Sequence, residues 1–212
     1  VDHQPLQRDH DRLVGDEHGY GGVMGARLFT ALVPPAALVE ELDAFLGPRR
    51  PAEPRLRWTR PEGWHLTTAF MGDVPERAVD PLVEALAEAA DRTPAFRLRL
   101  AGGGAFPWPL ETKVLWLGLA EGASELTSLA ERSRNAAVRA GVRVDGARFV
   151  PHLTLARANR AIDSTRLVRV LDTFDADGWT ADEFVLIQSH LRDRGNRYEV
   201  LHRFALSTGS RD

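Results

Sequence analysis

The sequence contains no cysteine and no long apolar run, and both absences exclude classes of protein. Without cysteine the chain has no disulfide bond, no thiolate zinc site and no cysteine nucleophile. No apolar run approaches the roughly 18 residues of a membrane-spanning helix, and no basic and then apolar segment of the signal-peptide type opens the sequence. We therefore expect a protein that does not associate with membranes and that acts in the cytoplasm.

A strong excess of charge of one sign is also missing. The 212 residues carry 27 basic and 30 acidic side chains, a net charge of −3, and the basic side chains are 26 arginines and a single lysine. This balance excludes a polybasic surface that holds long nucleic acids by charge alone, so a nucleic-acid partner would have to be bound locally. The hydrophobic content of 43% is enough for a sizeable core in one domain or two small lobes.

The first 26 residues differ from the rest of the chain. They contain five acidic residues, two arginines, three histidines and a cluster of glycines but few apolar residues, and they account for the whole net charge of −3. Such a segment buries little surface, and its irregularly spaced histidines do not predict a metal site. We expect a polar, flexible extension over residues 1–26 and one two-lobed domain over residues 27–208.

Strand-like and helix-like segments alternate through the rest of the sequence. Runs rich in strand formers predict strands at 27–33, 64–71, 95–101, 114–119, 149–156, 184–191 and 198–206. Apolar residues at helical spacing predict helices at about 38–46, 79–90 and 123–140, and from a cap at 163–164 to about 170. Residues 102–113 have the glycine and proline content of an irregular loop.

The last two predicted strands are joined by the short link at residues 192–196, which is typical of a hairpin and requires antiparallel pairing. The order of elements therefore indicates α+β sheets with helices on their outer faces. No predicted strand is followed by a nucleotide-binding glycine motif, which argues against a Rossmann or P-loop protein.

The most informative feature is a short pattern that occurs twice, as HLTT at residues 65–68 and as HLTL at residues 152–155, each in a predicted strand. Side chains alternate between the faces of a strand, so the histidine and threonine of each pattern share one face while the leucine points into the core. If residues 27–110 and 111–208 are near duplicates, a pseudo-two-fold axis brings the two patterns to face each other. The repeat then predicts one site with two imidazoles and two hydroxyls.

Two histidines in one site suit the hydrolysis of a phosphodiester without a metal. An imidazole titrates near pH 6.5, so one ring can take a proton from the attacking water while the other gives a proton to the departing oxygen. The hydroxyls of Thr67 and Thr154 would donate hydrogen bonds to the phosphate oxygens as negative charge develops there. The alternative, a metal bound by His65 and His152, is less favoured because neither strand offers a carboxylate or a third histidine at ligand spacing.

Together with their flanking segments, the two patterns resemble the 2H phosphoesterase superfamily, and within it the bacterial and archaeal RNA 2′,3′-cyclic phosphodiesterases, also called 2′-5′ RNA ligases. The resemblance is carried by RLFTALVPP, RWTRPEGWHLTTAFMGDV and VPHLTLAR, and it extends from about Arg27 to Leu206. It implies a bilobal α+β fold of the 2H phosphoesterase type. In that fold two pseudo-symmetric lobes of antiparallel sheet with outer helices surround a central cleft.

The resemblance also implies an enzyme, an RNA 2′,3′-cyclic 3′-phosphodiesterase. Such an enzyme hydrolyses the 2′,3′-cyclic phosphate of RNA or of a nucleoside to the 2′-phosphomonoester, with no metal and no other cofactor, and reverse 2′-5′ RNA ligation is a second activity to consider. Its partners would be RNA ends that carry a 2′,3′-cyclic phosphate, or cyclic nucleotides. We expect a monomer, no membrane contact and no protein partner.

The same resemblance suggests a role for five residues. His65 would be the general acid and His152 the general base, although the near symmetry of the two patterns also allows the reverse order. Thr67, Thr154 and Arg157 would bind the substrate phosphate. Strand alternation alone puts Arg157 on the face opposite His152, so Arg157 reaches the site only if the strand ends or bulges there.

Aromatic and basic residues near the patterns are further candidates. Phe106 and Trp108 would stack on the base of the substrate, and Trp64 is another candidate for this role. The connector at residues 49–60 carries five arginines that could meet an RNA backbone, although a solvated loop is the simpler interpretation. Thr68 departs from the family pattern, where this position is usually apolar, and this departure affects local packing rather than chemistry.

Two other functions stay open from the sequence. A protein with this site could bind RNA ends or nucleotides without catalysis, although both patterns are intact. Within the same superfamily, the substrate could instead be ADP-ribose 1″,2″-cyclic phosphate or a 2′,5′-linked oligonucleotide, because the two patterns recognise only the phosphate.

Overall fold

The computed structural model describes residues 25–146, 148–190 and 197–208. Residues 1–24 of the expected extension lie outside the described residues, and so does the link at 192–196 between the last two strands. The extension and the boundaries of the two-lobed domain therefore stay predictions. None of the helices in the described ranges is both long and apolar enough to cross a membrane.

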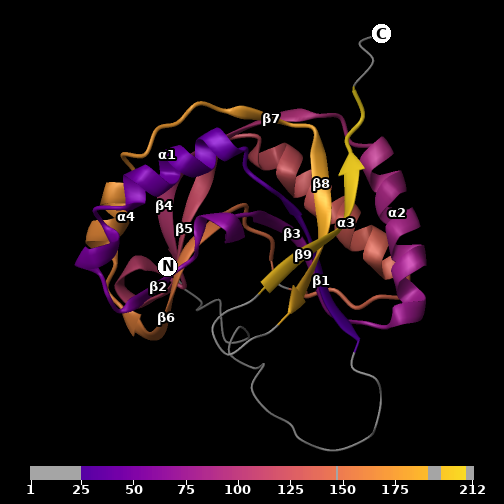
Figure 1. The fold of residues 1–212 in the computed structure, drawn as a ribbon, viewed down its shortest axis with the longest axis horizontal. Helices are drawn as coiled ribbons and strands as arrows, with labels where there is room; N and C mark the ends of the chain where they lie inside the picture. Colours follow the sequence, from indigo (N-terminus) through magenta and orange to yellow (C-terminus); the bar gives the residue numbers. More distant parts are fainter. Residues whose placement is uncertain (1–24, 147, 191–196, 209–212) are drawn as a thin grey trace, which may run out of the picture.

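The described strands form two antiparallel sheets, which Figure 1 shows in the middle of the molecule. The first sheet has the order β3-β1-β8-β9 and the second the order β2-β6-β5-β4-β7. The strands are β1 (Ala26–Leu32), β2 (Leu56–Trp58), β3 (Leu66–Val74), β4 (Phe96–Phe106), β5 (Thr112–Glu121), β6 (Leu153–Ile162), β7 (Trp179–Ala181), β8 (Glu183–His190) and β9 (Arg197–Ala205). Every pairing within these two sheets is antiparallel, including the expected pairing of β8 with β9.

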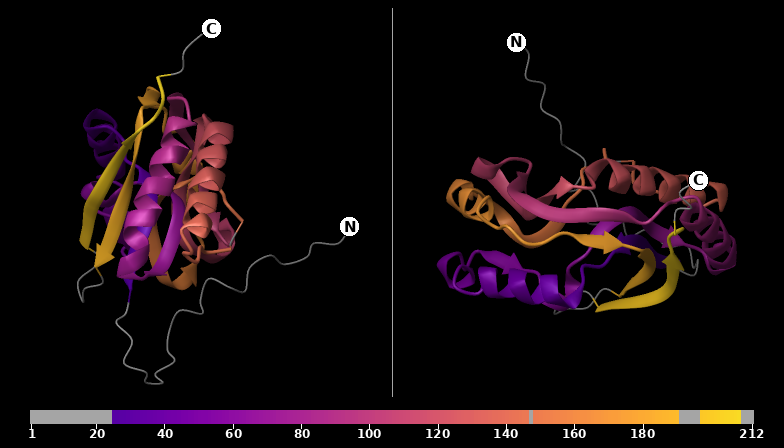
Figure 2. Two further views of the ribbon diagram at one scale, coloured as in Figure 1. Left: turned by 90° about the vertical axis from the view of Figure 1, so that its right-hand side faces the viewer. Right: turned by 90° about the horizontal axis from the view of Figure 1, so that it is seen from above.

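Helices pack at both ends of the molecule. They are α1 (Ala36–Leu46), α2 (Val79–Asp91), α3 (Ala123–Arg139) and α4 (Thr165–Leu171). Helix α3 packs against β3 and against α2, and the left view of Figure 2 shows α2 and α3 side by side in front of the strands. Helix α4 packs against β4 at the other end. The expected α+β class, with two sheets of antiparallel strands and helices packed on them, is confirmed.

The two sheets show the internal duplication in their strand order. The run β3-β1-β8 of the first sheet corresponds to the run β6-β5-β4 of the second, and β3 and β6 are the strands that carry the repeated patterns. Both strands begin at the leucine of the pattern, Leu66 and Leu153, one residue after the histidine. The strand starts predicted at residues 64 and 149 are therefore corrected to residues 66 and 153.

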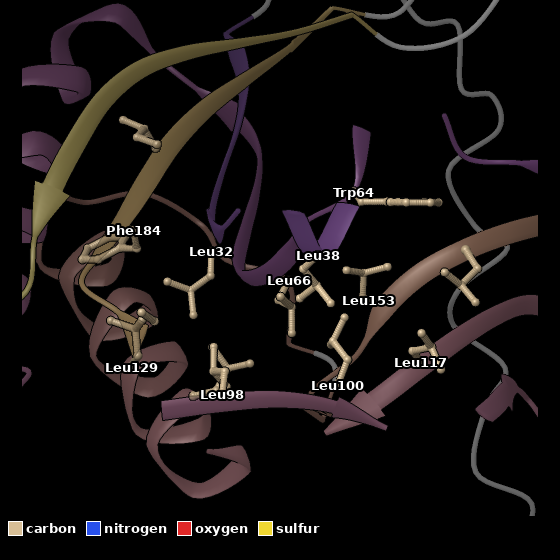
Figure 3. Packing of buried hydrophobic residues seen from close by; sticks show 14 of the residues in the cluster. Leu32, Leu38, Trp64, Leu66, Leu98, Leu100, Leu117, Leu129, Leu153 and Phe184 are labelled. Carbon is tan, nitrogen blue, oxygen red and sulfur yellow. The ribbon is translucent and has the colours of Figure 1, made fainter. Parts of the chain in front are cut away.

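A single apolar cluster joins both sheets to the helices. Leu66 and Leu153 are both fully buried in it, and Figure 3 shows them among the same group of side chains, with Leu32, Leu100 and Leu117 nearby. Burial of a leucine side chain contributes about 1.5–3 kcal/mol. Because the leucine of each pattern enters this core, the histidine and threonine beside it must point to the other face of the strand.

The loop expected at residues 102–113 is mostly strand. Strand β4 continues to Phe106, with a register shift around Gly102, whose φ is 80°. The glycines are needed for close packing rather than for a loop. A Cβ on Gly103 would lie 2.6 Å from the carbonyl oxygen of Val168 in α4, and a Cβ on Gly104 would lie 2.1 Å from the Trp116 ring. The short strands β2 and β7 were not predicted, because three residues are too few for a periodic pattern.

Candidate active site

The two histidines are anchored in the same way. His65 Nδ1 lies 2.7 Å from the carbonyl oxygen of Gly63, and His152 Nδ1 lies 2.7 Å from the carbonyl oxygen of Val150. A carbonyl oxygen can only accept a hydrogen bond, so each Nδ1 carries the hydrogen. In the neutral ring the unprotonated nitrogen is then Nε2, which does not take part in the hydrogen bond to the backbone carbonyl. Both rings are half-buried, so Nε2 of each ring can accept a proton from a bound molecule or donate one to it.

Two aromatic rings surround His65. The centroid of its ring lies 4.8 Å from that of Phe29 in β1 and 5.4 Å from that of Tyr198 in β9. Phe29 and Tyr198 also contact each other edge to face at 5.4 Å. Tyr198 is 37% exposed, so one part of its ring supports His65 and another is open to solvent. These contacts limit the orientation of the His65 ring.

A second pair of aromatic rings surrounds His152. Phe106 contacts the His152 ring edge to face at 5.0 Å, and Trp116 lies at 6.0 Å. The Trp116 ring occupies the space that a side chain at position 104 would fill, so Gly104 allows the indole to lie close to the sheet. Sequence reasoning identified Phe106 but missed Trp116, Phe29 and Tyr198.

The structure brings the two histidines to one place, although β3 and β6 belong to different sheets. The pKa of His65 falls from 6.5 to about 4, first because the surrounding protein desolvates the charged ring. The bond to Gly63 opposes this effect, while the positive charges of Arg157 and His152 lower the pKa further. Strand β3 also contacts β6 directly, so His65 and His152 lie close together, with Arg157 near enough for its charge to act on His65.

Arg157 reaches this site through a β-bulge. In the β5–β6 ladder Thr154 pairs with Trp116, and the next paired residue of β6 is Ala156, so Leu155 has no partner. An unpaired residue reverses the alternation of side chains along the strand. Arg157 therefore lies on the same face as Thr154, which strict alternation does not allow.

The first pattern has a bulge at the equivalent residue. Thr68 has no partner in the β1–β3 ladder, where Thr67 pairs with Ala31 and Ala69 pairs with Thr30. The Thr68 side chain is 2% exposed, and its hydroxyl lies 2.7 Å from the hydroxyl of Thr30, which is also fully buried. The polar residue at this position is therefore accommodated by a buried hydroxyl pair, away from the site.

The two threonines of the patterns are available for a ligand. Thr67 and Thr154 are both half-buried and follow their histidines on the same faces. Among the residues that the structure describes, neither hydroxyl has a hydrogen-bond partner. A phosphate between the histidines could therefore accept a hydrogen bond from each of them without breaking an existing one.

Arg157 lies in a basic and aromatic environment. Desolvation lowers its pKa, the nearby Tyr198 acts in the opposite direction, and the positive charge of Arg57 lowers it again. The side chain is nevertheless accessible to solvent and has no carboxylate partner within the described ranges. Tyr198 thus contacts His65 from the first sheet and lies near Arg157 of the second.

The other aromatic candidates lie elsewhere. Trp64 is only 2% exposed and belongs to the hydrophobic core, so the suggestion that it stacks on a substrate base is wrong. Trp108 is 44% exposed and makes no ring contact with either site histidine in the described structure. Outside the site, the ring of His202 is exposed and stacks on Phe204. The described residues contain no group of three or more His, Asp or Glu side chains arranged to hold a metal.

The duplicated sheets and the paired His-x-Thr patterns define a class of proteins that have solved members. The crystal structure of Escherichia coli LigT in its apo form matches with a TM-score of 0.70 and 28% identity over 87% of this chain and 99% of that chain. LigT complexed with 3′-AMP matches with a TM-score of 0.69 and 28% identity over 86% of this chain and 98% of that chain.

Sequence comparison gives the family. A model of the 2′-5′ RNA ligase superfamily matches residues 34–193. Two relatives are named RNA 2′,3′-cyclic phosphodiesterase, and each is 31% identical to this chain. The Aquifex aeolicus protein matches over 71% of this chain and 81% of its own length, and the Escherichia coli protein matches over 85% of this chain and 97% of its own length. The chain belongs to the 2′-5′ RNA ligase superfamily, and the resemblance noted in the sequence is confirmed.

Proposed function

We propose that this protein is an RNA 2′,3′-cyclic 3′-phosphodiesterase, which hydrolyses the 2′,3′-cyclic phosphate of an RNA end or a nucleoside to the 2′-phosphomonoester. The single observation that carries the proposal is the pair of matched histidines at the starts of the contacting strands β3 and β6, each anchored through Nδ1 to a backbone carbonyl. Relatives at 31% identity over most of the chain have this activity in their names.

In the proposed reaction His152 is the general base. Its Nε2 takes a proton from a water molecule, the water oxygen attacks the phosphorus, and the bond between phosphorus and the 3′ oxygen breaks. Positioned proton transfer of this kind contributes about 10²- to 10⁴-fold to the rate. The bond from Nδ1 to the carbonyl of Val150 holds the ring in the tautomer that this step requires.

His65 is the proposed general acid, which gives a proton from Nε2 to the departing 3′ oxygen. Its pKa of about 4 in the ligand-free protein means that the ring is neutral at pH 7. A cyclic phosphate carries a negative charge, which would offset the charges of Arg157 and His152 and raise the pKa of His65. In this proposal the substrate itself brings the acid into its protonated form.

The remaining site residues would hold the phosphate and the base. The hydroxyls of Thr67 and Thr154 and the guanidinium of Arg157 would donate hydrogen bonds to the non-bridging oxygens, where negative charge grows in the transition state. Phe106 contacts the His152 ring and is the better of the two candidates for stacking on the base, whereas the exposed Trp108 contacts neither histidine ring in the described residues.

The test is an assay with the four 2′,3′-cyclic mononucleotides and with a cyclic-phosphate-terminated oligonucleotide. Phosphorus NMR distinguishes a 2′-phosphate product from a 3′-phosphate product. The proposal requires the 2′-phosphate, and it requires the same rate in EDTA. A protein that binds these compounds without turnover, or that releases the 3′-phosphate, would contradict it.

A further inference from the structure

Arg57 lies directly opposite Arg157. The two residues are paired in the antiparallel β2–β6 ladder, and both side chains are exposed. Directly opposite residues share one face, with Cβ atoms about 4.5–5.5 Å apart, and like charges in such a pair are destabilising. The charge of Arg57 does act on Arg157, since it lowers the Arg157 pKa.

The neighbours of Arg57 fix the face on which it lies. Leu56 is 4% exposed and Trp58 packs against the core, so Arg57 between them must point to the opposite face. Thr154 and Arg157 lie on that same face of the sheet because of the bulge at Leu155. Arg57 therefore stands next to the site, one strand away from its phosphate-binding residues.

Two other arginines of the same connector pair with carboxylates, and Arg49 donates a hydrogen bond to the carbonyl oxygen of Phe45. Arg50 binds Asp43 at 2.5 Å and Arg55 binds Glu53 at 2.7 Å. In the described part of the chain no carboxylate pairs with Arg57 or with Arg157. Two neighbouring guanidinium groups without carboxylates are the arrangement expected where the charge is balanced by a bound ligand with more than one anionic group.

We propose that Arg57 is a specificity-determining residue, which binds the internucleotide phosphate 5′ to the nucleotide that carries the cyclic phosphate. This inference rests on the proposed function and deepens it, because Arg157 then holds the reacting phosphate and Arg57 the next phosphate along the strand. A cyclic mononucleotide has only one phosphate and leaves Arg57 unused. The pair therefore favours the end of an RNA strand over a free cyclic nucleotide.

The test compares one cyclic mononucleotide with a dinucleotide that ends in the same cyclic phosphate. In Arg57→Gln we expect kcat/KM to fall about tenfold on the dinucleotide and less than about twofold on the mononucleotide, because only the dinucleotide loses a charge-assisted hydrogen bond. The slope of log kcat/KM against log salt should become shallower by about 0.7 on the dinucleotide only. Arg57→Lys should keep most of that slope.

Matched measurements separate binding from folding. Arg169→Gln changes an exposed arginine of α4, a helix that packs on the opposite face of the second sheet, and should alter neither substrate's kinetics. The melting temperature of Arg57→Gln should not fall, since the substitution removes a like-charge contact.

The possible results are distinct. An equal loss of kcat/KM on both substrates would assign Arg57 to the reacting phosphate and overturn the inference. Unchanged kinetics on both substrates would also overturn it. If the unaltered protein turns over neither substrate, the proposed function itself fails, and this inference falls with it. A loss of kcat/KM confined to the dinucleotide, together with the shallower salt slope, supports the proposed function and the role of Arg57.

Discussion

Leu155 has no partner in the β5–β6 ladder, just as Thr68 has none in the β1–β3 ladder, and both are the fourth residue of the repeated pattern. The bulge is thus part of the duplication. It turns Arg157 toward the site in the second sheet, whereas the equivalent position in the first sheet is Phe70, which packs under Arg27. The two halves share their histidines and threonines but differ in the charge they offer to a phosphate.

Replacement of either histidine should remove most of the activity. His65→Ala and His152→Ala should each lower kcat on a 2′,3′-cyclic mononucleotide by at least about 10²-fold, since each removes one proton transfer. Steady-state kinetics measure this loss. His202→Ala is the control, because this exposed ring stacks on Phe204 outside the site. A nearly unchanged rate in either site variant would refute the two-histidine mechanism.

The pKa of His65 should respond to charge in the site. NMR titration of labelled histidine should give a pKa of about 4 for the ligand-free protein, and a higher value with the 2′-phosphate product bound. In Arg157→Gln the pKa of ligand-free His65 should rise, because a positive neighbour has been removed. A pKa that does not move in that variant would show that Arg157 is not close to His65.

The same shift predicts how stability depends on pH. His65 has a lower pKa in the folded protein than the usual 6.5, so the unfolded chain binds its proton first as the pH falls. The contribution of His65 to stability is complete above pH 6.5 and is lost between pH 6.5 and about 4. Urea unfolding of His65→Gln should therefore show a smaller decrease in free energy over this range than unfolding of the unaltered protein.

Arg157 should matter more for the transition state than for folding. Arg157→Gln should lower kcat/KM by about 10²-fold, because it removes charge from a site where negative charge develops, while Arg157→Lys should lose less. The melting temperature should stay close to that of the unaltered protein, since the side chain is exposed. Activity that survives Arg157→Gln within a few-fold would mean that another group binds the phosphate.

Gly104→Ala should disturb both packing and activity. The added Cβ would lie 2.1 Å from the Trp116 ring, so the indole beside His152 would have to move. Forcing extra volume into a packed site costs about 1–3 kcal/mol, which thermal denaturation would detect. Gly146→Ala is the matched control, because a Cβ there meets no heavy atom within 4 Å. Equal melting temperatures for the two variants would argue against this packing.

The hydroxyl pair of Thr30 and Thr68 should behave as a unit. Thr30→Val or Thr68→Val alone would leave the other hydroxyl buried without its partner, at a cost of about 1–3 kcal/mol. The double variant removes both hydroxyls and should cost less than the sum of the two single changes. A double-mutant cycle by urea unfolding measures this coupling, and purely additive effects would contradict it. Catalysis should change little in all three variants.

Local patterns predicted most of the strands and helices. The runs from Arg27 and from Val79 became β1 and α2 because their apolar residues repeat with the period of the element they form. The glycines of β4 misled this reasoning. Their composition resembles a loop, but Gly103 and Gly104 lie in β4. Glycine is needed at these two positions because α4 and Trp116 approach the strand too closely for a side chain.

The site could be predicted only in part for a related reason. The repeated pattern identified His65, Thr67, His152 and Thr154, and it left the face of Arg157 undecided. A bulge depends on how two strands pair, which the sequence of one strand does not reveal. Tyr198 carried no signal at all, because β9 is at the opposite edge of the first sheet from β3, and only the folded protein shows that its Tyr198 ring contacts His65.

The amino-acid sequence by itself determined which chemical groups this protein has and in what local setting, since a His-x-Thr at the start of a strand places an imidazole and a hydroxyl on one face. Tertiary structure alone decided that Arg157, Tyr198 and Arg57 join them. Side-chain alternation is a property of neighbours along the chain, whereas bulges, strand order and cross-strand pairs come from long-range packing of two sheets around one core.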